Sequence, residues 1–592
     1  MAARKIIVVG GGLAGLAAVI KIAEAGGTVD LFSIVPVKRS HSVCAQGGIN
    51  AAKNLKGEGD TTAQHFDDTI YGGDFLANQT PVKAMCEAAP AIIDLLDRMG
   101  VPFNRTPEGL LDFRRFGGTL YHRTAFAGAT TGQQLLYALD EQVRRYEAEG
   151  KVKKFEGWEF LSAIVDGKGI ARGIVAMDLR SMEVKAFPAD AIILATGGIG
   201  AIFGKSTNSV VCTGSAQSAV FQQGVYYANG EFIQVHPTSI PGEDKLRLMS
   251  ESARGEGGRV WVPRTPGDKR TACDIPESER FYFLEEWYPK YGNLVPRDVA
   301  TRAIHKVVYE LGLGIDGQPM VYLDLTHIDR ATLHHKLGGI LEIYEKFVGV
   351  DPCVEPMKIF PGMHYTMGGI WVDFKQMTNV PGIFAAGECE YQYHGANRLG
   401  ANSLVSCIFG GFQAGPNAIQ YANNLPAAED DGGAAAEVAR QSEINKKLVN
   451  NQGGENPFKL WRELGSVMTE HATVIRYNKN LKTADEKIVE LLSRYQRVNL
   501  SDKSQWANTS FAFARQLKNM LELARTITLG AILRDESRGA HYKPDFPDRN
   551  DERFLKTTKA SFTGTVEGPR LEFEEVDTQY IKPRPRRYDA AK

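Results

Sequence analysis

A glycine-rich loop follows a short apolar segment near the start of the chain. Residues 5–9 (Lys-Ile-Ile-Val-Val) are typical of a central parallel strand covered on both faces. Gly10, Gly12 and Gly15 come next, and residues 16–25 read as a helix. In this context Gly10 permits a tight turn, Gly12 lets the backbone approach a pyrophosphate, and Gly15 permits close packing of helix on strand. The pattern predicts a Rossmann-like α/β domain that binds a dinucleotide.

Two further apolar segments also run into glycines, at 191–195 and at 383–386. Strand-to-glycine transitions so far apart indicate one α/β domain interrupted by a long insertion, and 592 residues are too many for one core. Helical periodicity then dominates from about 435 to 534. We therefore expect a dinucleotide-binding domain (1–240 and 355–425), an α+β capping domain (241–354), a polar linker (427–435), a helical domain (435–540) and a small C-terminal tail domain (541–592).

Composition excludes several classes of protein. The formal net charge of -1 gives no electrostatic reason to expect a nucleic-acid partner. The seven cysteines include no Cys-x-x-Cys pair, so neither zinc nor an iron–sulfur cluster has obvious ligands and no metal site is expected. The longest apolar stretches are far too short for a membrane span, and no signal segment precedes the first strand. We expect a cytosolic protein that could reach a membrane only through another subunit.

His41 stands about one βαβ unit after the glycine loop, where the chain should pass close to a bound flavin ring. A nucleophilic imidazole just before Gly47 and Gly48 suggests a covalently held cofactor. The second strand ends in Ser33, where a nicotinamide-dependent dehydrogenase would carry an acid for the ribose hydroxyls. That substitution weakens the prediction of such a dehydrogenase.

Histidines and arginines recur among glycines later in the chain. His236, Arg254, Arg297, His364 and Arg398 each lie in such a stretch. A single histidine of this kind is usually a structural residue, and an Arg-Asp pair is usually a local salt bridge. Several together favour an anion site, and the planar fork of arginine suits a carboxylate. Glu251 lies three residues before Arg254, so on a helix the two share a face and could relay protons.

These stretches together resemble one family. Arg-Ser-His near Ala-Gln-Gly-Gly, His-Pro-Thr, Arg-Gly-Glu-Gly-Gly, Pro-Arg-Asp, His-Tyr-Thr-Met-Gly-Gly and His-Gly-Ala-Asn-Arg-Leu-Gly are similar to motifs of the flavoprotein subunit of succinate dehydrogenase and fumarate reductase. The match runs in order from Lys5 to the Arg-Gly-Ala-His motif at 538–541. The relatives differ at two positions: many have Thr where Ser250 stands, and many have a cofactor-contacting acid where Ser215 stands.

The resemblance implies FAD bound covalently through its 8α carbon to His41. It implies Arg297 as the proton-transferring group, with Glu251 and Arg254 carrying the proton to solvent. The implied dicarboxylate ligands are His236, Ser250, Glu251, His364 and Arg398. The cofactor residues that we expect are Gly10, Gly12, Gly15, Ser33, His41, Gly47, Gly48, Thr196, Gly197, Glu388, Ser403 and Leu404.

The activity implied first is succinate oxidation to fumarate, with electrons passed to an iron–sulfur subunit and through membrane anchor subunits of cytochrome b type to a quinone. The chain would then lie on the cytoplasmic side of the membrane. Quinol:fumarate reduction, the same chemistry reversed, stays open, because Gln46 occurs in relatives of both directions. L-aspartate oxidase and adenylylsulfate reductase share the fold but lack the flavin-linking histidine, so His41 argues against both. A non-catalytic scaffold is disfavoured because every acid/base position is filled.

Overall fold

A parallel five-stranded sheet forms the centre of the computed structural model, which describes residues 4–242, 246–425 and 432–588. Its strand order is β19-β10-β1-β2-β6. The strands are β1 (Lys5–Val9), β2 (Thr28–Ser33), β6 (Val152–Glu156), β10 (Ala191–Leu194) and β19 (Ile383–Ala385). Strands far apart in the sequence thus lie side by side, as the three strand-to-glycine transitions predict.

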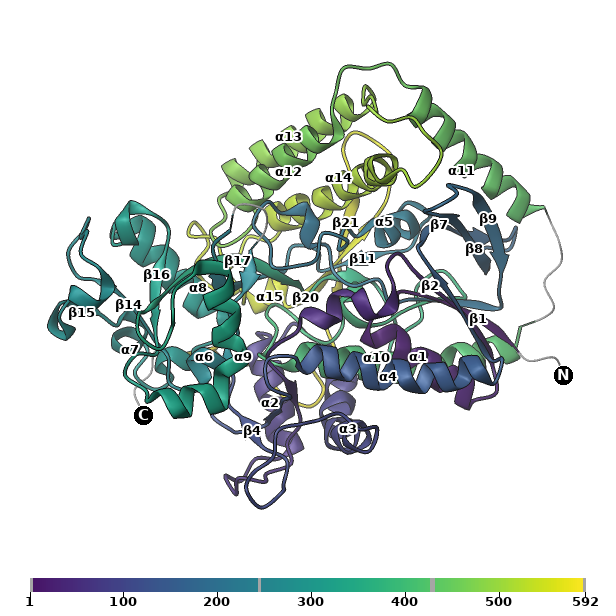
Figure 1. Ribbon diagram of the computed structural model, residues 1–592. Helices are drawn as coiled ribbons and strands as arrows, with labels where there is room; N and C mark the ends of the chain where they lie inside the picture. Colours follow the sequence, from purple (N-terminus) through teal and green to yellow (C-terminus); the bar gives the residue numbers. More distant parts are fainter. Residues whose placement is uncertain (1–3, 243–245, 426–431, 589–592) are drawn as a thin grey trace.

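Both faces of this sheet are covered, which explains the continuous apolar run in β1. Ile6 and Val8 pack against α1 (Leu13–Glu24), α4 (Thr131–Ala148) and α10 (Asn402–Asn423), which lie together in Figure 1. Ile7 and Val9 pack on the opposite side. There they meet an antiparallel sheet of β7 (Trp158–Val165), β8 (Ala171–Asp178) and β9 (Val184–Pro188). The first helix begins at Leu13, three residues before its expected start.

A second, six-stranded sheet takes four of its strands from the insertion and two from the segments on either side of it. Its long antiparallel strands β12 (Ile233–Ile240) and β17 (Met357–Thr366) leave and re-enter the part of the chain that contains the central sheet. Both strands carry predicted site residues. The remaining elements of this region are β13 (Arg247–Leu248), α6 (Ser252–Gly255), β14 (Arg259–Pro263), β15 (Arg280–Phe281), α7 (Phe283–Trp287), α8 (Arg297–His305), β16 (Val321–Asp324) and α9 (Arg330–Val348). They enclose a core of their own.

Four long helices follow and pack around a further core. They are α11 (Gly433–Asn450), α12 (Pro457–His471), α13 (Asn478–Tyr495) and α14 (Thr509–Leu533). The Asn456 and Asn508 side chains cap the first turns of α12 and α14. Most of the predicted linker at 427–435 lies outside the described residues. The helical content of this region agrees with the periodicity in the sequence.

The C-terminal segment returns to the middle of the molecule. After α15 (Asp551–Phe554), β20 (Lys556–Ser561) and β21 (Arg570–Glu575) join a four-stranded sheet with β11 (Tyr227–Ala228) and β18 (Gly369–Ile370). The last residues cross α2 (Thr62–Gly72) and α3 (Gln79–Arg98), where Gln79 Oε1 accepts hydrogen bonds from the backbone of Tyr580 and Ile581. The other elements include β3 (Ile49–Asn50), β4 (Phe113–Arg114), β5 (Thr124–Ala125) and α5 (Ser215–Gln222).

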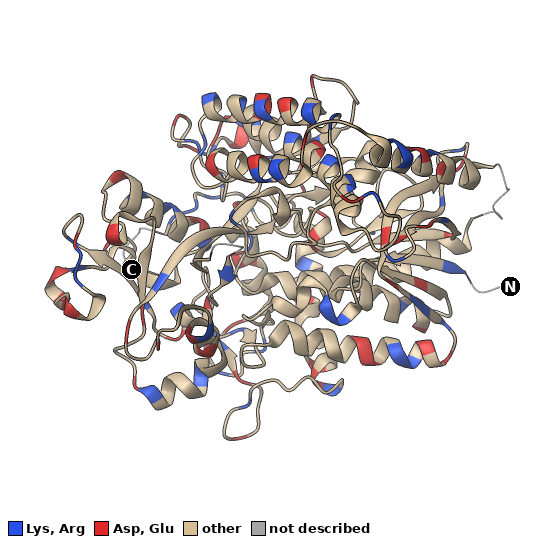
Figure 2. Ribbon diagram, turned by 45° about the horizontal axis from the view of Figure 1, so that its top comes forward, with Lys and Arg blue, Asp and Glu red and all other residues tan. Residues whose placement is uncertain are grey.

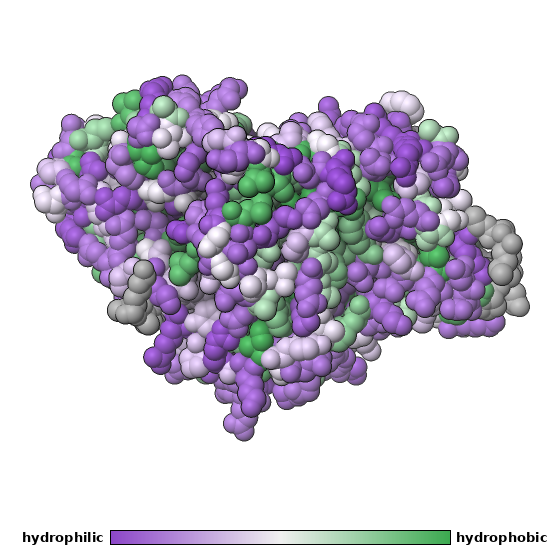
Figure 3. Space-filling model, turned by 90° about the horizontal axis from the view of Figure 1, so that it is seen from below, coloured by the Kyte–Doolittle hydropathy of each residue, from purple (hydrophilic) through white to green (hydrophobic). Residues whose placement is uncertain are grey.

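The outer surface carries mixed charge. Lys and Arg alternate with Asp and Glu along the outer helices instead of gathering by sign (Figure 2). Hydrophilic residues cover most of the face seen in Figure 3, where apolar residues lie mainly towards the middle. Within the described ranges, every helix is too short or too polar to cross a membrane.

Candidate active site

A cavity of about 470 Å³ extends from the glycine loop to the insertion. The predicted site residues that line it are Gly10, Gly12, Ser33, His41, Gly47, Gly48, Thr196, Gly197, His236, Ser250, Glu251, Arg297, His364, Glu388, Arg398, Ser403 and Leu404. Gly15 and Arg254 do not line the cavity but contact residues that do, Gly10 and Glu251 respectively. Residues predicted from motifs hundreds of positions apart therefore meet at one site.

The glycine loop has the shape that a pyrophosphate needs. Gly10 has φ +116°, and a Cβ there would lie 2.1 Å from the Ala195 carbonyl oxygen. A Cβ on Gly15 would lie 1.9 Å from the Gly10 oxygen, so α1 can approach the loop only because this residue is glycine. At Gly12 the nearest atom to a Cβ is Ser42 Oγ, 3.1 Å away. The loop and the N-terminus of α1 thus fit the phosphates of a dinucleotide.

His41 begins a short 3-10 turn (His41–Cys44), and its ring contacts the Asn208–Ser209 segment. Its Nδ1 accepts a hydrogen bond from the Ser209 amide (3.2 Å), and the Asn208 side-chain nitrogen lies 3.4 Å from its Nε2. The same Asn208 amide donates to the His364 carbonyl oxygen (2.8 Å). The Asn208–Ser209 segment therefore fixes His41 relative to the strand that carries His364.

A buried carboxylate joins two arginines at the other end of the cavity. Glu251 Oε2 accepts hydrogen bonds from Arg297 Nε (2.9 Å) and Nη2 (2.7 Å), and Glu251 Oε1 accepts one from Arg254 Nη2 (2.8 Å). Burial acts to raise the pKa of Glu251, but Arg297 and Arg254 outweigh it and hold that pKa below its ordinary value. Glu251 is therefore an ionised link between the two guanidinium groups.

Two histidines and a third arginine complete this end. The rings of His236 and His364 lie 4.9 Å apart, and burial lowers the pKa of both well below the ordinary value, so both imidazoles are neutral. His236 Nε2 and Arg398 Nε are buried, and neither has a hydrogen-bond partner among the described residues. Burial and the nearby Arg297 lower the pKa of Arg398 to about 9. Unsatisfied buried donors beside cationic groups fit an anionic ligand with several oxygens.

Glu388 lies where the flavin ring is expected. Its Oε1 accepts a hydrogen bond from the Thr366 amide (3.1 Å), and burial raises its pKa to about 7. Ser215, the departure noted in the sequence, accepts a hydrogen bond from Asn519 of α14 (2.7 Å). The serine hydroxyl thus joins α5 to the helical region and adds no charge to the cavity.

Three positioning groups were not predicted from the sequence. Gln234 accepts a hydrogen bond from Arg297 Nη1 (2.9 Å) and donates one to the Arg398 carbonyl oxygen (2.8 Å). Arg114 donates from Nε to the Gly47 carbonyl oxygen (3.0 Å), and Thr207 Oγ1 lies 2.8 Å from His364 Nδ1. Gln234 stands two residues before His236, which was a usable signal. Neither Arg114 nor Thr207 stands in a motif.

The fold and this cavity define an FAD-binding protein. Residues 5–404 match the family model described as FAD binding domain, and residues 461–588 match the model described as Fumarate reductase flavoprotein C-term. The chain is 62% identical to the Succinate dehydrogenase flavoprotein subunit of Bacillus subtilis (strain 168), with 100% of both chains covered. It is 36% identical to the Fumarate reductase flavoprotein subunit of Escherichia coli (strain K12), over 98% of this chain and 95% of that one.

A solved structure of E. coli quinol fumarate reductase superposes with a TM-score of 0.92 at 33% identity, over 100% of this chain and 99% of that one. Adenylylsulfate reductase from Archaeoglobus fulgidus, at 19% identity and a TM-score of 0.76 over 98% and 96%, shares the fold alone. The chain belongs to the family of succinate dehydrogenase and fumarate reductase flavoprotein subunits. The resemblance and the fold class expected from the sequence are thereby confirmed.

Proposed function

We propose that this chain is the flavoprotein subunit of a succinate:quinone oxidoreductase and oxidises succinate to fumarate. The observation that carries the proposal is the group of buried donors at the end of the dinucleotide cavity, where Arg297, Arg398 and His236 surround a space suited to carboxylates. The 62% identity to a succinate dehydrogenase subunit favours oxidation as the direction. Fumarate reduction is the second candidate, favoured by the relatives at 36% identity.

The substrate-binding residues would act through their fixed donors. His236 and His364 are neutral, so each can donate one N–H to a carboxylate oxygen without a change in its charge. Arg398 would bind a carboxylate with its planar fork, and the Ser250 hydroxyl would add one hydrogen bond. Together they would hold the two central carbons of succinate in one orientation. Bound FAD would supply the hydride acceptor.

Arg297 is the proposed proton-transferring group. Arginine ordinarily stays protonated, so it needs a partner that shares its proton. Glu251 is bonded to both Nε and Nη2 of Arg297, and its other oxygen is bonded to Arg254. Arg254 Nη1 in turn donates to the Asn293 carbonyl oxygen (2.6 Å), at the partly buried edge of this cluster. The chain Arg297–Glu251–Arg254 is therefore the proposed proton route.

The predicted cofactor residues would hold FAD along the cavity, with the phosphates at Gly10 and Gly12 and the ring near Glu388, Ser403 and Leu404. We further propose a covalent 8α link to His41. His41 lines the same cavity as Glu388, Ser403 and Leu404, which supports this link. Flavin that stays with the acid-denatured wild-type chain and leaves a His41→Ser variant is the expected result. Free flavin from both proteins would refute the covalent link.

We also propose that electrons leave for an iron–sulfur subunit and that anchor subunits of cytochrome b type hold the chain at the cytoplasmic side of the membrane. One related structure is titled Quinol-Fumarate Reductase with Menaquinol Molecules, which supports a quinone as the final electron acceptor of the complex. Purification of the native complex, with its subunits and haems identified, tests this proposal.

Turnover of the flavin-loaded chain with succinate and an artificial acceptor tests the activity. We expect Arg297→Lys to lower kcat by about a hundredfold or more, because it loses the fork that bonds Glu251 and Gln234. Arg584→Gln, which alters an exposed arginine of the tail, should match the wild type. Near-full turnover by Arg297→Lys would contradict the proton route, and no turnover by the wild type would favour a scaffold. Rates of both directions in the native complex, with its own quinone, decide between the two candidates.

A further inference from the structure

The Arg-Gly-Ala-His motif at 538–541 has no part in the site described above, yet it is buried between two segments that form the site. Gly539 and Ala540 lie against the loop that carries Arg398 and against α8, whose first residue is Arg297. Arg538 and His541 are 1% and 0% exposed.

The contact with α8 is made by Arg302. Its Nη1 donates a hydrogen bond to the Gly539 carbonyl oxygen (2.7 Å), and its Nη2 donates to Asp298 Oδ2 (3.2 Å). Arg302 stands five residues after Arg297 on the same helix. A shift of α8 away from the motif would therefore stretch this bond and move Arg297 with it.

The contact with the Arg398 loop is made by the backbone. The Ala540 amide donates to the Ala396 carbonyl oxygen (2.9 Å). Gly539 has φ +54°, and a Cβ there would lie 2.6 Å from that same oxygen, so only glycine permits the approach. Ala396 stands two residues before Arg398. The motif thus touches both arginine-bearing segments within two consecutive residues.

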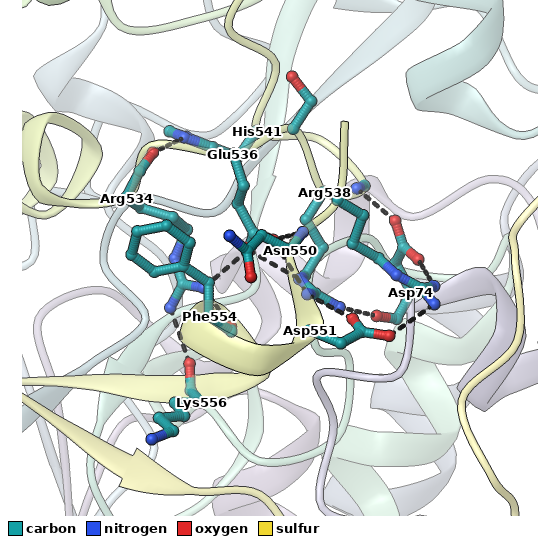
Figure 4. A network of polar contacts seen from close by, with 12 residues as sticks. Asp74, Arg534, Glu536, Arg538, His541, Asn550, Asp551, Phe554 and Lys556 are labelled. Atoms are coloured by element: carbon teal, nitrogen blue, oxygen red, sulfur yellow. Dashed lines mark hydrogen bonds and ion pairs between the residues drawn. The ribbon is translucent and has the colours of Figure 1, made fainter. Parts of the chain in front are cut away.

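The motif is itself held rigidly. The Gly539 amide donates to Asp74 Oδ2 (2.9 Å), and Arg538 donates to the Asp74 carbonyl oxygen (2.9 Å). Arg538 is also paired with Glu536 (2.8 Å) and Asp551 (2.8 Å), as Figure 4 shows. Buried charge-assisted hydrogen bonds of this kind fix a segment in one geometry.

A rigid link between Arg297 and Arg398 would oppose the electrostatic repulsion between them. Arg297 and Arg398 are both cationic and buried, and like charges at close range in a low dielectric repel each other. Glu251 bonds Arg297 and Arg254 with its two oxygens, whereas Arg398 approaches from another segment of the chain. Inside the site, Gln234 is bonded to both Arg297 and the Arg398 backbone. Without a dicarboxylate between them, the two arginines need a second restraint.

We propose that Arg302, Gly539 and Ala540 form an outer bridge that holds Arg297 and Arg398 at their working separation before substrate binds. Arg302 is a positioning residue: it touches neither the cavity nor the substrate, and it acts through α8. This inference rests on the proposed dicarboxylate site. Removal of the bridge should weaken binding of the dianion, because part of the binding energy must then draw the two arginines together. Once the complex has formed, the geometry is restored, so kcat should change little.

The test compares Arg302→Gln with wild type in the flavin-loaded chain. We expect KM for succinate, and Kd for malonate from the flavin difference spectrum, to rise about tenfold, with kcat within about twofold. Malonate is the probe because a single methylene joins its two carboxylates, so it has no pair of neighbouring carbons that could be oxidised to a double bond. The side chain of Arg302 is 27% exposed, so its replacement leaves no sealed cavity. Arg302→Lys, which can still reach the Gly539 oxygen, should recover most of the affinity.

Arg525→Gln is the matched control. Arg525 also donates from Nη1 to a carbonyl oxygen of the C-terminal segment, that of Val566 (2.7 Å), and also pairs with an acid, Asp485, but it lies on α14 and away from α8. Unchanged malonate affinity in Arg302→Gln, or an equal loss in Arg525→Gln, would overturn the outer bridge. A wild-type chain that neither binds malonate nor oxidises succinate would instead refute the proposed function.

Discussion

Arg534 allows a test of whether burial or the number of ion pairs determines how much an arginine contributes to the free energy of unfolding of this fold. All five of its N–H groups are bonded: Nε to Glu231 (2.8 Å), Nη1 to Glu536 (3.0 Å) and the Phe554 carbonyl, and Nη2 to the Lys556 carbonyl and Thr558 (Figure 4). The side chain is 0% exposed. Replacement by Met removes the cation and, with it, the one ion pair that Glu231 forms among the described residues.

Arg494 is the comparison. Its five N–H groups are also bonded, and every acceptor is a carboxylate oxygen of Glu455, Glu463 or Glu490. If the number of ion pairs decided, Arg494 would contribute more to stability than Arg534. Its side chain is 21% exposed, however, and so water can replace the lost bonds. The two sites therefore separate the two explanations.

We expect Arg534→Met to lower the free energy of unfolding by about 3–5 kcal/mol, the cost of stranding a buried charge, and Arg494→Met by about 1 kcal/mol or less. Urea denaturation followed by circular dichroism measures both. The double variant Glu231→Leu with Arg534→Met should be more stable than Arg534→Met alone, because no carboxylate is then stranded at that position. An equal or larger loss in Arg494→Met would refute the reasoning.

Two further predictions concern the pH dependence of stability. Arg586 donates two hydrogen bonds to Asp298 (2.6 and 2.9 Å). Burial opposes ionisation of Asp298, but Arg586 and Arg302 outweigh it and lower the Asp298 pKa to about 2. The ionised carboxylate therefore contributes about 2 kcal/mol to the free energy of unfolding above its ordinary pKa, and this contribution is lost as pH falls. The stability deficit of Arg586→Gln, from urea denaturation, should therefore shrink between about pH 4 and about pH 2, and a constant deficit would contradict this. Burial raises the pKa of Glu159 to about 7, so this group costs up to about 3 kcal/mol once pH exceeds its ordinary pKa. Glu159→Gln should thus gain stability relative to wild type between about pH 5 and about pH 8, and no gain would show that the carboxyl ionises freely.

The parts of the fold that the sequence predicted are those with a local signal. Parallel strands buried on both faces read as apolar runs, which is why β1, β10 and β19 were recognised within one residue of their bounds. The start of α1 was placed too late, because its first residues, Leu13 to Gly15, belong to the glycine motif and were read as loop, and its N-cap, Gly12, has no side chain that marks the start of a helix. Bounds of the expected domains stay predictions; β12 ends at Ile240, the last residue of the first expected segment, and β17 begins at Met357, two residues after the expected return at 355.

The site was predictable where chemistry-bearing residues stand among glycines in motifs. The residues that position them were not, because their partners are remote in sequence: Arg302 and Gly539 are 237 residues apart, and Arg114 bonds Gly47 across 67. The buried ion pairs of Arg534 and Arg538 were also missed. Both arginines fall in the expected helical domain (435–540), where charged residues are expected at the surface, and only the tertiary fold supplies the carboxylates that bury them.

The strand order of the central sheet determines how long β1 stays unpaired while the chain is being synthesised. Val8 of β1 pairs with Ile193 of β10, so at about 5–20 residues per second the ribosome leaves that edge of β1 uncovered for roughly 10–40 s. β19 completes the sheet only after Ala385 has been made. The Gln79 side chain stays without one of its acceptors for longer still, because the Ile581 carbonyl oxygen lies 502 residues downstream. An apolar strand edge exposed for this long invites pairing with other chains, so protection of the nascent polypeptide during elongation matters more for this molecule than its final compactness suggests.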